Sequence, residues 1–181
     1  AGAPDVWVTA GGRAFPGRVV AALGSPWELG RPVRIILRSG CYVTHDAVHY
    51  NHLSPFGGRI PETAPLDEAL EVWGAVLSLP EPGLAIVGFG KRDVSHDLEL
   101  PVPRFVKSSG PHPPRRLVGE ASIFALNDQH AFMRVGPDAS LNVGDLIGCG
   151  ISHPCTAFDK WRLIPVVDDA YNVIDAMLTY F

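Results

Sequence analysis

The sequence lacks the features that mark several large classes of protein. It has no basic stripe and its net charge is −4, so nucleic-acid binding is not expected. Uninterrupted apolar runs such as residues 84–87 are far too short to span a bilayer, and residues 1–5 do not begin a signal peptide. The three cysteines, Cys41, Cys149 and Cys155, have no spacing typical of a disulfide framework. These absences favour a protein of the reducing cytoplasm that has no membrane partner.

What the chain does contain favours strands and loops. Its 181 residues include 19 glycines and 17 prolines, which divide the chain into short segments and leave little room for long helices. A hydrophobic fraction of 46% is enough for a core in one domain or in two small ones.

The first part of the chain, residues 1–58, predicts α/β structure. A short buried strand is expected at residues 6–9, followed by a glycine turn and a helix at 17–23, and a second strand is expected at 33–37. A further helix is expected from Thr44 to about Leu53. Two βα units cannot bury both faces of a parallel sheet, so we expect this part to belong to a larger barrel.

The second part, residues 59–181, predicts an all-β domain in the form of a compact barrel. Proline-rich residues 100–118 are expected to form a loop. Hairpins or paired strands are expected at residues 69–79 with 84–89, at 121–126 with 131–135, and at 163–167 with 173–178, and a further strand is expected at 145–151.

His153 and Cys155 form an H-x-C motif directly after the strand expected at 145–151. On an extended segment, side chains two residues apart point to the same face, so one metal ion could bind both. Zinc accepts mixed nitrogen and sulfur ligands, and two protein ligands would leave the open positions of a catalytic site. The alternative is that Cys155 is a small core residue and His153 an ordinary hydrogen-bonded histidine.

Several motifs together resemble the D-serine dehydratase-like family, and most closely its bacterial amino-acid deaminase branch. They occur in the family's order and span nearly the whole chain, and the H-x-C motif is the most specific of them. The motifs are TAGG at 9–12, LRSGCYVTHD at 37–46, GFGKRDVS at 88–95, LNDQH at 126–130, GISHPCT at 150–156 and FDKWR at 158–162.

The resemblance implies a fold and two cofactors. These enzymes have the alanine-racemase fold type, so the fold expected here is α+β: the C-terminal βα units of a TIM-type barrel in residues 1–58, then an all-β domain in 59–181. The resemblance makes His153 and Cys155 ligands of zinc. It also makes two loops the binding site for the phosphate of pyridoxal 5′-phosphate, through Gly11, Gly12, Ser39, Gly40 and Tyr42. Arg13 departs from the family pattern, in which a small hydroxyl residue is usual.

Other residues leave alternatives open. His130 is a candidate catalytic residue lining the active site, or an exposed turn histidine. His45 and Asp46 could form a catalytic dyad, but capping of a helix N-terminus explains them better. The cluster Lys91-Arg92-Asp93 could orient a substrate or could be a solvated charge cluster. Cys41 and Cys149 are interpreted as core or loop residues.

The activity implied by the resemblance is β-elimination from a D-serine-type amino acid, which gives a 2-keto acid and ammonia. The partners expected are a small-molecule D-amino acid and a second copy of the chain in a homodimer. The family's cofactor-binding lysine would lie before residue 1, so the 181 residues alone are expected to be inactive. The alternatives are a retro-aldol lyase similar to D-threonine aldolases, or a β-domain that only dimerises or binds.

Overall fold

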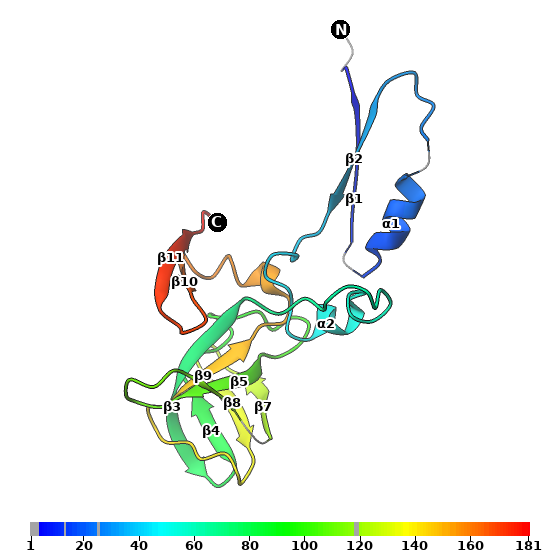
Figure 1. The fold of residues 1–181 in the computed structure, drawn as a ribbon. Coiled ribbons are helices and arrows are strands. Elements are labelled where there is room, and N and C mark those ends of the chain that lie inside the picture. Colours follow the sequence, from blue (N-terminus) through cyan, green and yellow to red (C-terminus); the bar gives the residue numbers. More distant parts are fainter. Residues whose placement is uncertain (1–3, 13, 25, 118–119) are drawn as a thin grey trace.

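The protein is mainly β structure with few helices. The computed structural model describes residues 4–12, 14–24, 26–117 and 120–181, so Arg13 lies outside the described residues. Figure 1 shows a curled sheet, a βαβ unit that extends away from it and a hairpin near the C-terminus. The helices are α1 (Pro16–Leu23), α2 (His49–Leu53) and the 3₁₀ helix η1 (Pro154–Thr156). The strands are β1 (Val6–Gly11), β2 (Val33–Arg38), β3 (Glu71–Glu81), β4 (Leu84–Val87), β5 (Val102–Lys107), β6 (Arg115–Arg116), β7 (Ala121–Leu126), β8 (Ala131–Val135), β9 (Leu146–Gly150), β10 (Leu163–Val167) and β11 (Val173–Leu178).

The N-terminal unit consists of β1, α1 and β2, as the sequence predicts. The two strands pair in parallel, with Val6 opposite Val33 at one end and Gly11 opposite Arg38 at the other. Pro16 suits the first turn of α1, where its missing N–H is not needed for a helix hydrogen bond. None of the described residues between 4 and 40 is buried. The unit therefore shows parallel βα structure, but a TIM-type barrel is not present in the described chain.

The helix predicted from Thr44 to about Leu53 is wrong in its first half. Residues 41–44 form turns, and α2 contains only five residues, beginning at His49. His45 has a φ of 52°, a left-handed conformation that interrupts an α-helix. The side chain of Asp46 binds the N–H groups of Val48 and Tyr50, which gives this backbone an alternative to earlier helical hydrogen bonds.

The central sheet has seven antiparallel strands in the order β6-β5-β9-β3-β4-β8-β7. It curls until β5 contacts β7, but no β-ladder closes it among the described residues. The compact barrel predicted for residues 59–181 is thus a curled half-barrel, and the predicted hairpin β10–β11 forms a separate two-stranded sheet. The hairpin β3–β4 and the pair β7–β8 are confirmed.

The loop predicted for residues 100–118 is partly wrong, because β5 and β6 lie within it. Pro103 is tolerated in β5 because the pairing register with β9 shifts between Pro103 and Phe105, at an irregularity where a ladder hydrogen bond is not required. The antiparallel pairing of β5 with β9 outweighs the local preference of proline for loops.

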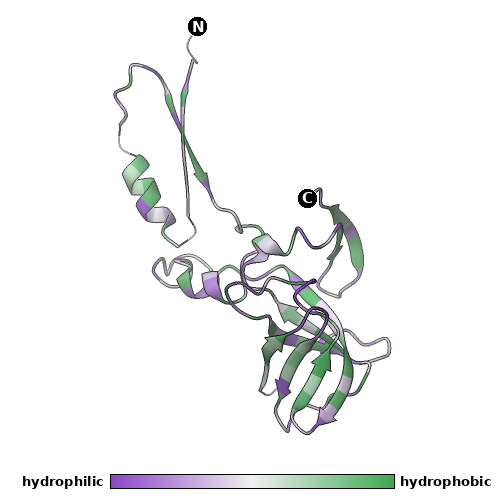
Figure 2. Cartoon of the chain, turned by 180° about the vertical axis from the view of Figure 1, so that it is seen from behind, coloured by the Kyte–Doolittle hydropathy of each residue, from purple (hydrophilic) through white to green (hydrophobic). Residues whose placement is uncertain are grey.

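The core lies inside the curl of the sheet. Burial alternates along β3, where Val72, Gly74 and Val76 face inward, as expected for a strand with one solvated face. Figure 2 shows hydrophobic colour along these strands and also along the N-terminal unit, although the latter is not buried. None of the described helices is long and apolar enough to cross a membrane. The largest fully buried apolar side chains are Phe89, Met133, Ile147, Val76, Val87, Val94 and Val106.

Candidate metal and cofactor site

His153 and Cys155 lie on the loop that follows β9, but not on an extended segment. The strand ends at Gly150, His153 has a φ of 53°, and Cys155 is the middle residue of η1. The expectation that both side chains share one face of a strand is therefore wrong. Pro154 accounts for the difference, because its fixed φ and missing N–H start a helical turn more readily than they continue a ladder.

Asp46 fixes the backbone of this loop. Its side chain is completely buried, and Oδ2 accepts a hydrogen bond from the His153 N–H at 2.6 Å. Oδ1 accepts from the N–H groups of Val48 at 2.8 Å and Tyr50 at 3.2 Å, at the start of α2. This supports the capping interpretation for Asp46, whereas the Thr44 hydroxyl donates to the carbonyl of His45 instead. One carboxylate thus joins the segment before α2 to the loop after β9.

Asp97 holds the side chain of His153. The Asp97 Oδ2 atom lies 2.6 Å from His153 Nδ1, and Oδ1 accepts a bond of 3.4 Å from the Thr156 hydroxyl. Burial acts to raise the pKa of Asp97, but the hydrogen bond from His153 and further hydrogen bonds outweigh it and lower that pKa below the ordinary value. Asp97 is therefore ionised at neutral pH. Asp97 lies just beyond the motif at 88–95 and outside every other motif, so the motifs give no signal for this contact.

Cys41 contacts Cys155, which the sequence reasoning missed. The Cys41 thiol is buried and in hydrogen-bonding contact with the Cys155 thiol. Burial, followed by the effect of Cys41, raises the pKa of Cys155. Only the folded chain brings these positions together, because the residues between them form most of the central sheet. Cys149 is a core residue, as expected, and burial raises its pKa strongly.

The residues at this loop suit zinc in chemical type. When Asp97 accepts a hydrogen bond from the Nδ1–H group of His153, the Nε2 lone pair remains for a metal, and Cys155 offers sulfur. Among the described residues, no group of three or more histidine, cysteine, aspartate or glutamate side chains could hold a metal ion. The pair by itself would supply only two ligands, which is too few for a closed structural site.

The two glycine loops meet at one end of the parallel pair, as predicted. The register places Gly11 opposite Arg38, so the loops that begin at Gly12 and Ser39 are neighbours. The Ser39 hydroxyl is buried and has no hydrogen-bond partner in the described part of the chain. The N–H of Gly12, in contrast, donates to the Arg38 carbonyl at 3.3 Å and is already engaged. Tyr42 is mostly exposed.

Arg38 is a further residue that the sequence reasoning missed. A Cβ atom at Gly11 would lie 2.9 Å from Arg38 Cζ, and one at Gly40 would lie 3.6 Å from a guanidinium nitrogen of Arg38. The guanidinium thus lies beside both glycine loops, where it can bind an anion in two-point fashion. With the unpaired Ser39 hydroxyl, it makes this end of the pair suitable for a phosphate group.

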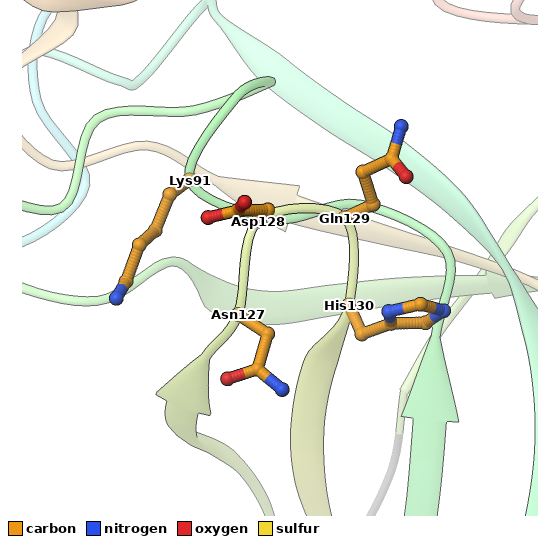
Figure 3. Close-up of a pocket in the computed structure, with 5 residues that line it drawn as sticks. All are labelled: Lys91, Asn127, Asp128, Gln129 and His130. Atoms are coloured by element: carbon orange, nitrogen blue, oxygen red, sulfur yellow. The ribbon is translucent and has the colours of Figure 1, made fainter.

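His130 lies in a different, polar depression (Figure 3). Five residues line it: Lys91, Asn127, Asp128, Gln129 and His130. The side chains of His130 and Lys91 point to opposite sides of the turn between β7 and β8. No hydrogen bond joins the His130 ring to His153 or Cys155 among the described residues, so a catalytic role stays a prediction.

Within the residues that the structure describes, the charged residues near this depression and the buried His45 make no contact with the candidate metal ligands that supports a role in the site. Arg92 and Asp128 form an exposed ion pair at 3.8 Å, which favours a solvated charge cluster. His45 is buried, with no partner for either ring nitrogen in the described ranges.

Comparison with known proteins identifies the family. The sequence model of the family described as "putative serine dehydratase domain" matches residues 69–167, which is more than half of the chain. The chain belongs to this family. The match begins just before β3 and includes the whole central sheet and the His153 loop, so family membership rests on the β part of the chain.

Solved structures show the same fold. D-threonine aldolase from Filomicrobium marinum matches at 22% identity with a TM-score of 0.65, over 93% of this chain and 40% of that one. D-threo-3-hydroxyaspartate dehydratase from Delftia sp. HT23 matches at 18% identity with a TM-score of 0.57, over 91% and 47%. A cysteine-to-alanine mutant of such a dehydratase, in the metal-free form, matches at 15% identity with a TM-score of 0.55. This chain therefore spans less than half of these proteins, and no curated protein sequence matches it.

Proposed function

We propose that this chain is part of a lyase that uses pyridoxal 5′-phosphate and zinc to eliminate water from a D-serine-type amino acid. The products are a 2-keto acid and ammonia. One observation carries the proposal: the segment that resembles a phosphate loop and the H-x-C loop are in direct contact. Asp46 bonds to the His153 N–H and the Cys41 thiol contacts Cys155, so a cofactor and a metal bound there would act on one substrate.

The glycine loops supply the phosphate site in this proposal. The Ser39 hydroxyl and the backbone at Gly11 and Gly40 would donate hydrogen bonds to the phosphate, and the Arg38 guanidinium would balance the charge of the dianion. Gly12 contributes by its conformation, since its φ of 152° disfavours other residues and its N–H is engaged. Tyr42, which is exposed, would add a hydroxyl donor. The bound cofactor supplies an electron sink for negative charge at the substrate Cα.

The H-x-C loop supplies the metal site. His153 would hold zinc through Nε2, and Cys155 would hold it as a thiolate. Asp46 and Asp97 keep the loop in one conformation, so the two ligands do not have to be ordered on binding. Bound zinc acts as a Lewis acid on the substrate hydroxyl or carboxylate.

The proposal divides the chain at residues 58 and 59 into a remnant of the cofactor-binding barrel and a β domain that carries the metal site. A homodimer in the cytoplasm is proposed as the working form.

The three lysines here, Lys91, Lys107 and Lys160, do not match the cofactor-binding position of the family. We therefore expect the 181 residues alone to release no pyruvate from D-serine, and release at roughly 1–10³ s⁻¹ would contradict this expectation.

The test of the metal site is elemental analysis of the full-length enzyme. We expect one zinc ion per chain, and Cys155→Ser should lose most of it because a neutral hydroxyl is a poor zinc ligand. Cys149→Ala is the control, since Cys149 is buried elsewhere in the core. Unchanged zinc in Cys155→Ser would refute the assignment.

A second test separates the proposed activity from the aldolase alternative. The aldolase alternative would be favoured if the complete enzyme released glycine and acetaldehyde from D-threonine but no 2-keto acid from D-serine.

A further inference from the structure

The imidazole of His153 is held by a residue outside every motif of the sequence. Asp97 lies between β4 and β5, far from His153 in the chain. Its Oδ2 atom is 2.6 Å from His153 Nδ1, and its Oδ1 atom accepts the weaker bond from Thr156, which follows Cys155. Both oxygens of one carboxylate therefore bind the loop that carries the proposed metal ligands.

Two carboxylates bind different parts of the loop that contains His153. Asp46 binds the backbone N–H of His153, and Asp97 binds the ring. His153 has a left-handed backbone conformation that is unfavourable for a residue with a side chain, so the loop needs such anchors. The side chain of Asp97 is 48% exposed, which means that it can be replaced without opening the core.

The bond to Asp97 also selects the tautomer of the ring. A carboxylate is an acceptor only, so His153 must place its proton on Nδ1. The lone pair is then on Nε2, at the far side of the ring. In many metal sites a carboxylate orients a histidine ligand in this manner and raises its basicity.

We propose that Asp97 is a positioning residue that fixes the Nδ1–H tautomer and the orientation of His153, so that Nε2 is presented to the metal. The inference rests on the proposed metal site and adds to it the residue that sets the geometry of its nitrogen ligand. Asp97 itself does not touch the metal or the substrate.

Three variants of the chain test this inference. Asp97→Ala removes the acceptor, whereas Asp97→Asn keeps a neutral amide oxygen that can still accept the Nδ1–H bond. Asp159→Ala is the matched control, because it removes an equal charge from the loop that carries His153. The Asp159 carboxylate is half-exposed and pairs with Lys160 and not with His153. Circular dichroism and thermal unfolding establish that all three fold.

Two readouts are measured. Nitrogen-15 chemical shifts of the histidine rings in metal-free protein should show the Nδ1–H tautomer at His153 in the wild type and in Asp97→Asn, and a mixture in Asp97→Ala. Zinc affinity, measured by competition with a chelating dye, should fall by about 10–100-fold in Asp97→Ala and by less in Asp97→Asn. Asp159→Ala should change neither quantity.

The two readouts separate this inference from the proposed function. A wild-type chain that binds no zinc refutes the metal site, whatever Asp97 does. An unchanged tautomer in Asp97→Ala, or an unchanged zinc affinity in that variant when the wild type binds zinc, overturns the role of Asp97. An equal loss of affinity in Asp159→Ala would also overturn it, because charge alone would then explain the effect.

Discussion

Single carboxylates join segments of the chain that are far apart in sequence. Asp46 joins the turn before α2 to the loop after β9, and Asp97 joins the segment after β4 to the same loop. Glu71 does the same for the last hairpin: it accepts a bond from the Trp73 indole at 2.8 Å and bonds of 3.2 and 3.3 Å from the Tyr171 hydroxyl. Tyr171 lies in the turn between β10 and β11, so Glu71 anchors that hairpin to β3.

The Tyr171 hydroxyl should give the chain a distinct response to alkaline pH. Burial, together with the charge of Glu71 and the hydrogen bond to it, raises the pKa of Tyr171 from 10.0 to about 12. The folded state therefore holds the proton more tightly than the unfolded state. This stabilisation is complete below pH 10 and is lost as the pH rises toward about 12. Replacement by phenylalanine removes this pH-dependent contribution.

For Tyr171→Phe we expect a loss of roughly 0.5–1.5 kcal/mol of unfolding free energy at neutral pH, from the lost hydrogen bond. The variant should also lack the last step of the tyrosinate absorbance titration. Urea unfolding at several pH values and the absorbance titration measure the two effects. Tyr180→Phe, at an exposed residue, is the control and should leave the highest step in place. A highest step that survives in Tyr171→Phe would contradict the assignment.

Between elements, the pairing of β3 with β9 depends on one glycine. Gly148 lies opposite Trp73, and a Cβ atom there would be 2.6 Å from Trp73 Cε2 and 2.7 Å from Cη2. The indole lies over the bare backbone of β9 and packs beside Phe105 and Tyr171. Because the Trp73 N–H is also bonded to Glu71, the ring cannot move without cost. The strand pair and the aromatic cluster are thus coupled.

Gly148→Ala should therefore destabilise the chain by about 1–3 kcal/mol through overpacking. The change should appear in chemical unfolding and in a shift of tryptophan fluorescence as Trp73 is displaced. Gly17→Ala is the matched control, because a Cβ atom at Gly17 in α1 meets no atom within 4 Å and alanine favours a helix. Equal stabilities of the two variants would show that Trp73 adjusts freely.

The chain consists of a part with a buried core, from residue 41 onward, and an N-terminal unit whose described residues form none. Every buried residue of the described chain lies at position 41 or later, while β1, α1 and β2 expose large apolar side chains such as Trp7, Ile36 and Leu37. Parallel strands are normally covered on both faces, so the N-terminal unit needs further protein around it to become stable. Figure 1 shows this unit extending from the sheet, which carries the family match.

Limited proteolysis with trypsin should separate the two parts. We expect rapid cleavage after Arg18, Arg34 and Arg38 in the exposed unit, and a resistant product that begins near residue 39. Arg134, in β8 between β4 and β7, is the internal comparison and should be cut at least roughly tenfold more slowly because β8 must open first. Mass spectrometry over time measures both rates. Cleavage after Arg134 at the rate of Arg18 would contradict the division.

Local chemistry in the sequence determined most of the strands, the parallel βα unit and the two donors of the H-x-C motif. The strand-like run at 69–79 predicts β3, and an apolar segment before a glycine turn predicts β1, because these preferences act within a few residues. The tertiary structure alone decided that β5 forms despite Pro103, that the sheet curls without closing, and that His153 lies in a turn.

The partners of the candidate site were also decided by tertiary structure. Asp97, Cys41 and Arg38 reach His153, Cys155 and the glycine loops through contacts between distant segments. No spacing or periodicity encodes such contacts, because they exist only after the strands have paired and the loops have been brought to the same end of the molecule. The sequence by itself predicted the donors His153 and Cys155. The tertiary structure determined which side chains contact them.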